Sequence, residues 1–210
     1  METENTVVIG GAGTGIGRAT ARKLAADGFH VVAVGRRRAP LDSLASEIGP
    51  QVDVIEADLA TEAGAAAVAA QVESAGRGCA GVVAALRKPI EHDGGRVVLI
   101  SSVAALRGSG GGAYGAMKAA LHAWAFDLAR ELGPGGGTAN VIAPGFVPDT
   151  EFWAGRLTDE SRRERAAQTL VGREGTPAEI ASLIAWLLGP DGGWMTGQVL
   201  SPNGGVVLGR

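Results

Sequence analysis

The sequence lacks the features that mark secreted, membrane-spanning or polyanion-binding proteins. A single cysteine, Cys79, excludes a disulfide within the chain and is expected to be a small buried hydrophobe rather than a nucleophile. No apolar stretch approaches the roughly 18 residues of a membrane span, and residues 1–4 are acidic and polar, unlike a signal peptide. Neither charge sign dominates, with a net charge of −3 and acids and bases interspersed. We therefore expect a cytoplasmic protein that binds neither a membrane nor nucleic acid.

Glycine and apolar residues are plentiful. The 34 glycines show no collagen-like period, so they indicate many tight turns. With 210 residues and 46% hydrophobic content, the chain can bury a sizeable core. No internal repeat or linker divides it, which predicts a single domain spanning residues 1–210.

A glycine-rich loop lies between an expected strand and an expected helix near the N-terminus. Residues 6–9 read as a short buried strand, residues 10–17 are mostly glycine, and residues 18–27 read as a helix closed by Gly28. A strand, a glycine loop and a helix together place backbone N–H groups and a helix N-terminus against a phosphate. The spacing G-x-G-x-x-G is absent, and G-x-x-x-G-x-G stands instead at Gly11, Gly15 and Gly17. The alternative is a turn that binds no ligand.

Three arginines follow the second expected strand, residues 31–34. An NAD site usually ends this strand with an acid, whereas an NADP site places arginine there for the 2′-phosphate. Here Gly35 takes the place of the acid, and Arg36, Arg37 and Arg38 follow. This pattern favours NADP(H) over NAD(H), the alternative being a solvated basic turn.

Tyr114 and Lys118 lie four residues apart on an expected helix, so they share one face. The lysine ammonium would favour the phenolate and lower the pKa of the phenol, preparing Tyr114 to exchange a proton with a carbonyl or alcohol oxygen. Ser101 and Ser102 follow an expected strand at residues 96–100, at the end where α/β sheets place their ligands. The helix is supported by an apolar stripe of Met117, Ala120, Leu121, Trp124, Leu128 and Leu132, and by its end at Gly133-Pro134. The motif alone is weak, because an ion-pairing lysine near a half-buried tyrosine looks the same.

The other expected elements complete an α/β pattern of alternating strands and helices. We expect helices at residues 41–48, 61–74, 159–169 and 176–188, the last with a capping box of Thr176 and Glu179. Further strands are expected at residues 52–55, 138–143 and 198–200. The predicted fold is a Rossmann-type, doubly wound parallel sheet.

Five motifs together resemble the short-chain dehydrogenase/reductase family and occur in its order from Val7 to Gly205. They are Gly11-x-x-x-Gly15-Ile16-Gly17, Ile100-Ser101-Ser102, Tyr114-x-x-x-Lys118, residues 140–145 (NVIAPG) and Thr196-Gly197-Gln198. The resemblance implies a nicotinamide cofactor and a small-molecule carbonyl or alcohol substrate. It implies Tyr114 as general acid/base, Ser102 as the residue that orients the substrate oxygen, and Lys118 as the residue that holds the nicotinamide ribose. In the family, the catalytic serine usually stands one residue further from the tyrosine than Ser102 does, and this spacing fits Ser101 instead.

The resemblance also implies the cofactor contacts, without any metal. Residues 11–17 would carry the pyrophosphate, Asp58 would approach the adenine, and Val147 and Thr150 would meet the carboxamide and neighbouring phosphate. The implied cofactor-binding set is Gly11, Gly13, Gly15, Ile16, Gly17, Arg36, Arg37, Asp58, Leu59, Tyr114, Lys118, Pro144, Gly145, Val147 and Thr150. Residues 148–170 resemble the family's substrate lid, in which Phe152 and Trp153 either face the substrate or only pack. The family further implies a homodimer or homotetramer.

One large block of the family pattern is absent. The family has a fourth strand ending in Asn-Asn-Ala-Gly and then a helix with a catalytic asparagine, and neither motif occurs here. Gly78 takes the asparagine's place, and about thirty residues are missing near residues 77–79, including a central strand. Either residues 81–85 serve as a substitute strand or a segment has been omitted, and we favour omission. The chain is then an NADP(H)-dependent oxidoreductase or, alternatively, a catalytically impaired relative that binds nucleotides or partner proteins.

Overall fold

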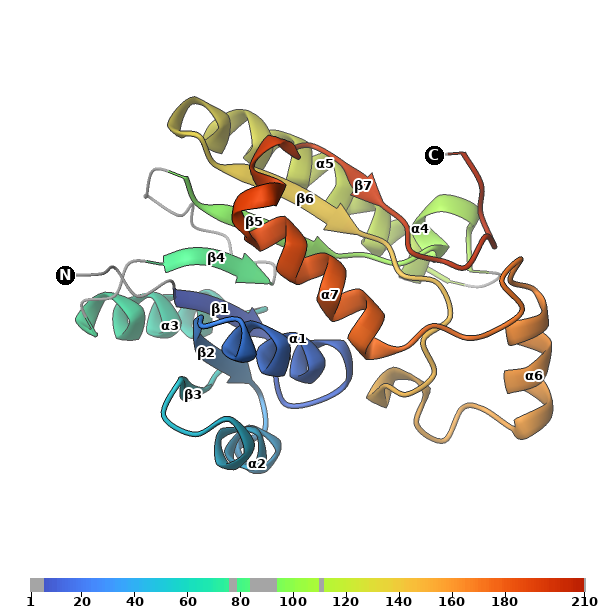
Figure 1. Ribbon diagram of the computed structural model, residues 1–210, viewed down its shortest axis with the longest axis horizontal. Helices are drawn as coiled ribbons and strands as arrows, with labels where there is room; N and C mark the ends of the chain where they lie inside the picture. The colour runs from blue at the N-terminus through green and yellow to red at the C-terminus, as the bar shows by residue number, and fades with distance from the viewer. Residues whose placement is uncertain (1–5, 76–78, 84–93, 110–111, 210) are drawn as a thin grey trace.

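The chain forms one seven-stranded sheet with helices on both faces (Figure 1). The computed structural model describes residues 6–75, 79–83, 94–109 and 112–209. All neighbouring strands are parallel, in the order β3-β2-β1-β4-β5-β6-β7, which confirms the expected α/β class. The strands are β1 (Thr6–Gly10), β2 (His30–Gly35), β3 (Val52–Glu56), β4 (Cys79–Val83), β5 (Arg96–Ile100), β6 (Thr138–Ile142) and β7 (Val199–Leu200).

The long helices cover the two faces of the sheet. Apolar side chains of α1 (Gly15–Ala26), α2 (Arg38–Ile48) and α7 (Pro177–Leu188) pack on one face. Those of α3 (Glu62–Ser74) and α5 (Tyr114–Leu132) pack on the other. The remaining helical segments are α4 (Ala104–Arg107), α6 (Asp159–Ala167), η1 (Gly133–Gly135), η2 (Glu151–Trp153) and η3 (Pro190–Trp194). No described helix has the length and apolarity to cross a membrane.

Both faces of the strands are buried, so the strands read as continuous apolar runs. In β1, Val7 and Ile9 join the cluster under α1 and α7, whereas Val8 joins the cluster under α3. In β5, Val98 points to the first face and Leu99 to the face under α5. This alternation follows from the two-residue period of a strand. It places the carboxyl end of β5 beside the start of α5.

β4 fills the central position between β1 and β5. Gly81 pairs with Val7 on one side and with Arg96 on the other. A Cβ atom on Gly81 would lie 2.9 Å from Leu188 Cδ2 and 3.2 Å from the Arg96 carbonyl oxygen, so a larger residue here requires its neighbours to shift. From the sequence, a substitute strand at residues 81–85 is the less favoured of the two alternatives, and the structure has a strand at this position, from Cys79 to Val83. Gly78, which stands in the place of the family's asparagine, lies outside the described residues, and the side chain of Cys79 is likewise not described.

The predicted apolar stripe of α5 is wrong in its first turns. Met117 is 62% exposed and Ala120 is exposed, whereas Leu128 and Leu132 are buried as predicted. The inward positions of the first turns hold Gly115 and the half-buried Lys118 instead. A Cβ on Gly115 would come within 2.8 Å of the Ala104 carbonyl oxygen, because α4 packs closely there. The start of α5 thus turns its polar functional face toward β5.

Candidate active site and cofactor-binding loop

The glycine loop after β1 is a close turn that leads directly into α1. Gly11 and Gly15 have φ angles of +70° and +53°, which side-chain-bearing residues rarely adopt. A Cβ on Gly17 would lie 2.3 Å from the Gly11 carbonyl oxygen, so the helix start packs against the loop. No atom lies within 4 Å of the Cβ position of Gly11, which leaves open space beside its backbone. α1 begins at Gly15 rather than at the predicted residue 18, so its first N–H groups belong to the loop.

The three arginines after β2 have different surroundings. Arg38 begins α2, three residues earlier than predicted, and pairs with Asp42 at 2.8 Å. Arg37 forms an ion pair with Glu151 of η2, which lies 114 positions away in the sequence. Arg36 is exposed and makes no ion pair with the residues that the structure describes. Of the three arginines, Arg36 is therefore solvated, whereas Arg37 and Arg38 form ion pairs.

Asp58 and Leu59, which the family resemblance assigns to the adenine side, follow β3. Asp58 is exposed, and one of its carboxylate oxygens accepts a hydrogen bond from the Ala60 N–H at 3.0 Å. Leu59 is half-buried and packs against the cluster under α3. The two residues thus lie at the carboxyl end of β3, on the same edge of the sheet as the glycine loop.

Ser101 and Ser102 follow β5 and have opposite environments. Ser101 is 4% exposed, and its hydroxyl donates to the Lys118 carbonyl oxygen at 2.9 Å. The Nε2 atom of His122 lies 2.9 Å from the Ser101 Oγ. Ser102 is half-buried, and its Oγ accepts the Ala104 N–H at 3.2 Å. The hydroxyl of Ser101 is thus committed to α5, whereas that of Ser102 retains its proton for another acceptor.

Tyr114 and Lys118 are both half-buried in the first two turns of α5. The Lys118 Nζ donates to the Ile100 carbonyl oxygen at 2.8 Å, across from the end of β5. Burial lowers the pKa of Lys118 below its ordinary 10.5, because the ammonium loses water contacts. An ammonium has three N–H donors, so two remain for other acceptors. The structure therefore brings Ser102, Tyr114 and Lys118 to one end of the sheet.

The segment after β6 closes over the same end of the sheet. Pro144 and Val147 are buried, and a Cβ on Gly145 would come within 2.7 Å of Asn203 Cα. The Thr150 hydroxyl donates to the Val147 carbonyl oxygen at 3.3 Å. Thr150 also packs against the glycine loop, since its Cβ lies 3.1 Å from the position of a Cβ on Gly15. These residues link the loop after β6 to the start of α1.

An aromatic cluster lies on this segment. The ring centroids of Tyr114 and Phe152 are 5.5 Å apart. Trp153 meets Phe152 edge-on at 4.9 Å and Phe146 at 5.3 Å. The guanidinium of Arg165 lies 4.9 Å from the Trp153 ring centroid, within cation–π range. Phe152, at 44% exposed, thus has both a packing contact and a solvent-facing surface beside the tyrosine.

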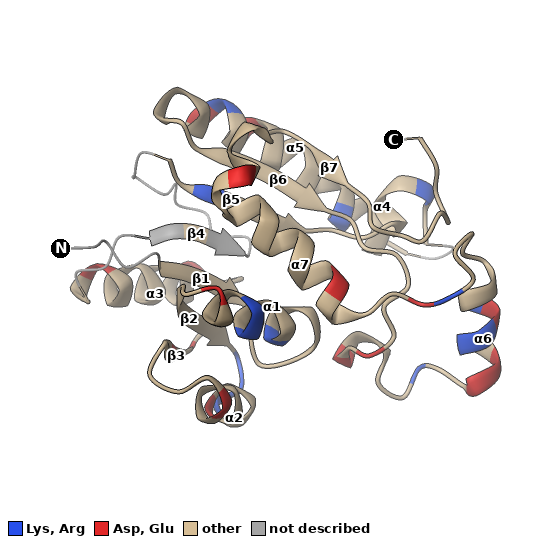
Figure 2. Cartoon of the chain, viewed as in Figure 1, with Lys and Arg blue, Asp and Glu red and all other residues tan. Residues whose placement is uncertain are grey.

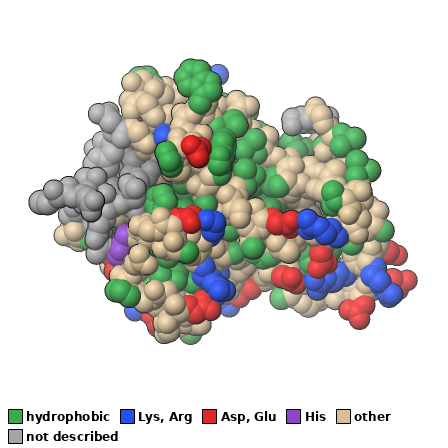
Figure 3. Space-filling model, viewed as in Figure 1, with side chains coloured by type: hydrophobic (Ala, Val, Ile, Leu, Met, Phe, Trp, Pro, Cys, Tyr) green, Lys and Arg blue, Asp and Glu red, His purple; other side chains and the backbone are tan. Residues whose placement is uncertain are grey.

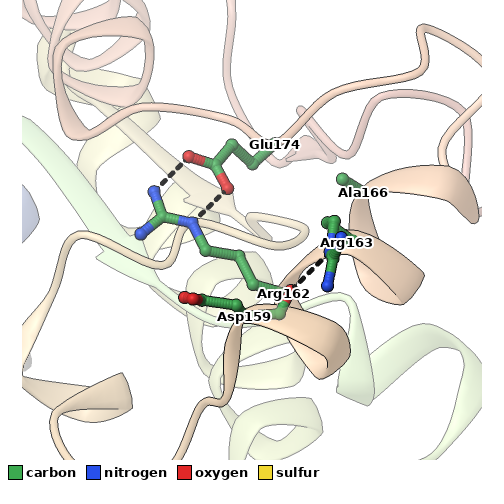
Figure 4. Close-up of a pocket in the computed structure, with 5 residues that line it drawn as sticks. All are labelled: Asp159, Arg162, Arg163, Ala166 and Glu174. Carbon is green, nitrogen blue, oxygen red and sulfur yellow. Dashed lines mark hydrogen bonds and ion pairs between the residues drawn. The ribbon is translucent and has the colours of Figure 1, made fainter.

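Two cavities among the described residues are lined by residues other than Tyr114. One of about 440 Å³ is bordered by α6 and by Glu174, whose carboxylate pairs with Arg162 (Figure 4). Arg162 also bonds Asp149 at 3.1 Å, so it ties together the two ends of the segment that contains α6. A second, of about 170 Å³, is lined in part by Phe146 and Asn203. The sequence did not indicate this role of Arg162, because charged residues on an amphipathic helix usually face solvent.

Charges of both signs cluster on α6 and around α1, while the strands carry almost none (Figure 2). On the face shown in Figure 3, acidic and basic side chains interleave and no region of a single sign forms. This distribution matches the balance of charges in the sequence and gives no extended basic surface on that face.

The sheet order and the strand–glycine loop–helix unit define a Rossmann-type, dinucleotide-binding fold. A family model described as "short chain dehydrogenase" matches residues 5–80, and one described as "Enoyl-(Acyl carrier protein) reductase" matches residues 77–207. The chain belongs to the short-chain dehydrogenase/reductase family. The two matches meet at residues 77–80, where the family pattern is interrupted.

Individual relatives agree with this placement. The chain is 34% identical over 248 aligned positions to the short-chain reductase protein NovJ of Streptomyces niveus, covering 98% of this chain and 95% of NovJ. It is 38% identical to the 3-oxoacyl-[acyl-carrier-protein] reductase FabG of Escherichia coli over 60% of this chain and 51% of FabG. A crystal structure of a short-chain dehydrogenase/reductase from Brucella melitensis superposes with a TM-score of 0.89 at 28% identity, covering 100% of both chains. Since the NovJ alignment has more positions than this chain has residues, the relative carries a segment that this chain lacks, as predicted.

Proposed function

We propose that the chain is an NADP(H)-dependent oxidoreductase that transfers a hydride between the nicotinamide and a carbonyl or alcohol carbon. The observation that carries the proposal is the convergence of Ser102, Tyr114 and Lys118 at the carboxyl end of β5, where parallel sheets place their ligands. Membership in a family that includes NovJ and FabG, both named as reductases, supports the reaction class.

The residues present fit a dinucleotide. Open space beside Gly11 and the start of α1 at Gly15 form a cradle of glycine backbone, with the Thr150 side chain at its edge, that suits a pyrophosphate. Arg36 and Arg37 stand at the end of β2, the position from which arginine meets a 2′-phosphate. When bound, the nicotinamide supplies or accepts the hydride.

The side chains of this chain would manage the substrate oxygen and its proton. Ser102 donates its hydroxyl proton in a hydrogen bond to the carbonyl oxygen and so orients it. Tyr114 gives its phenolic proton to that oxygen as the carbon is reduced, and takes it back in the oxidation direction. Lys118, with two N–H donors left beyond Ile100, holds the ribose. The environments of the two serines support Ser102 over Ser101 for this role.

Residues 148–170 form the substrate lid in this proposal. Phe152 beside the Tyr114 ring would then meet the substrate, with Trp153 behind it. Arg162, bonded to both Asp149 and Glu174, would hold the base of the lid in place.

One observation favours the alternative, a catalytically impaired relative that binds nucleotides. The asparagine residues that the structure describes both have structural partners. Asn140 donates to the Met195 carbonyl oxygen and accepts the Gln198 N–H, while Asn203 organises its own turn. Neither is available to relay protons to Lys118. In an impaired enzyme, we would therefore expect the supply of protons to Tyr114 to be slow.

The cofactor assignment is tested by titrating the protein with NADPH and NADH. NADPH should bind more tightly, and Arg36→Ala should weaken NADPH binding roughly tenfold or more, because an arginine–phosphate contact is charge-assisted. Arg38→Ala is the matched control, since Arg38 already pairs with Asp42 inside α2. Equal affinities for the two cofactors, or tighter binding of NADH, would contradict the assignment.

A further inference from the structure

Glu151 of η2 reaches the groups that a cofactor phosphate would use. Its carboxylate forms an ion pair with Arg37, and the Thr14 side chain also helps to lower its pKa. Thr14 belongs to the glycine loop and is the N-cap of α1, but it makes no capping bond to its own helix. A segment that follows β6 thus places an anion between the glycine loop and the arginine run.

Packing brings Glu151 to this position. Its neighbour Thr150 lies against Gly15, with the side-chain Cβ and Cγ2 at 3.1 and 3.2 Å from the position of a Cβ there. Arg37 holds the pKa of Glu151 below its ordinary 4.5, with a further contribution from Thr14, so the side chain is a carboxylate at neutral pH. Arg37 donates to a carboxylate in the same way that it would donate to a phosphate oxygen.

We propose that Glu151 is an internal anion that competes with the phosphate of the cofactor for Arg37, and so determines cofactor affinity and the preference for NADP(H). This inference rests on the proposed function. Binding of NADP(H) replaces the Arg37–Glu151 pair by a pair between Arg37 and the 2′-phosphate. NAD(H), which has no 2′-phosphate, gains no such pair, and Glu151 keeps its partner.

The competition also links the cofactor to the tyrosine. Phe152 follows Glu151 in the same short turn, and its ring lies 5.5 Å from that of Tyr114. Exchange of the Glu151 partner of Arg37 therefore acts on a turn that also carries an aromatic neighbour of Tyr114.

The test is the NADPH and NADH affinity of Glu151→Gln at low salt, measured by calorimetry on the full-length chain. We expect NADPH to bind about two- to fivefold more tightly and NADH to change little, because an exposed ion pair contributes up to about that factor. Glu151→Asp keeps the charge but shortens the side chain, and should also tighten NADPH binding. Glu131→Gln removes an exposed carboxylate at the far end of α5, outside the lid and the cofactor loop, and should leave both affinities unchanged.

A double-mutant cycle assigns the effect to Arg37. In an Arg37→Ala background, Glu151→Gln should leave NADPH affinity unchanged, because no guanidinium remains to be released. Weaker NADPH binding by Glu151→Gln would overturn the inference and make Glu151 a residue that holds the cofactor. Unchanged binding would overturn it as well. If the unaltered protein binds neither nucleotide, the proposed function itself fails, and the inference fails with it.

Discussion

At the residue scale, Ser101 and Ser102 are adjacent in the chain but have different surroundings. Ser101 sits in a buried network with the Lys118 carbonyl and His122, and burial lowers the pKa of His122 below its ordinary 6.5. Ser102 faces the half-exposed end of β5. A buried hydroxyl with two partners stabilises the fold, whereas a hydroxyl with a free proton can bind a substrate oxygen.

Alanine substitution of each serine separates the two roles. Ser102→Ala should lower the rate of carbonyl reduction about a hundredfold with little change in melting temperature, because it removes one donor to the substrate oxygen. Ser101→Ala should cost about 1–3 kcal/mol of stability, since it removes a buried hydroxyl that bonds the Lys118 carbonyl oxygen and the His122 ring. Activity assays and thermal melts of both variants check this. The reverse pattern would make Ser101 the substrate-binding serine.

The candidate site residues were largely predictable from local motifs, but their partners were not. Spacing alone places Tyr114 and Lys118 on one helix face, and glycine content alone indicates the turn at residues 10–17. Spacing could not decide between Ser101 and Ser102, because the decision depends on which hydroxyl α5 covers. Nor could it show the contact of Arg37 with Glu151, which joins residues 114 positions apart.

At the scale of elements, β4 shows how tertiary context overrides local preference. Glycine and alanine are poor strand formers, yet residues 79–83 complete the sheet because β1 and β5 both need a partner. The missing family motif favoured an omitted segment over a strand there, and the observed strand begins two residues before the alternative at residues 81–85. Tertiary context also decides the first turns of α5. The helical period predicts that Met117 lies on the buried apolar face, but the side chain is exposed.

Gly81→Ala tests whether this segment occupies the centre of the sheet. The added methyl would meet Leu188 Cδ2 at 2.9 Å and the Arg96 carbonyl oxygen at 3.2 Å, so we expect a loss of about 1–3 kcal/mol, seen as a lower melting temperature. Gly133→Ala is the control, because its Cβ position is open and its φ is negative. A neutral or stabilising Gly81→Ala variant would indicate an exposed loop instead.

The capping box of α7 predicts an acid-dependent contribution to stability. Arg173 and the Thr176 groups lower the pKa of Glu179 from 4.5 to about 2. The stabilising contribution of the Glu179 carboxylate to the folded state is therefore complete above about pH 4.5 and is lost as the pH falls toward 2. The melting temperature of Glu179→Gln should lie below that of the unaltered protein at neutral pH, and the difference should shrink across this range. A difference that is constant with pH would contradict the assignment.

At the scale of the whole molecule, large apolar side chains remain exposed on α5 and α7. Met117 and Phe126 on α5 are 62% and 38% exposed, and Trp186 on α7 is 42% exposed. These surfaces exceed what one buried helix face needs and are consistent with the homodimer or homotetramer expected from the family. Sedimentation velocity at micromolar concentration should show an oligomer, and Phe126→Lys should shift it toward monomer. A monomeric unaltered protein would refute the oligomer.

The measurement that tests the central proposal most directly is NADPH oxidation by the unaltered protein and by Tyr114→Phe with a panel of ketones and 3-oxoesters. We expect turnover by the unaltered protein. In the variant we expect a fall of about 10²–10⁴-fold, with NADPH affinity changed at most a fewfold, because only the proton-transferring hydroxyl is lost. A folded protein that binds NADPH, transfers no hydride to any carbonyl and is unaffected by Tyr114→Phe would contradict it.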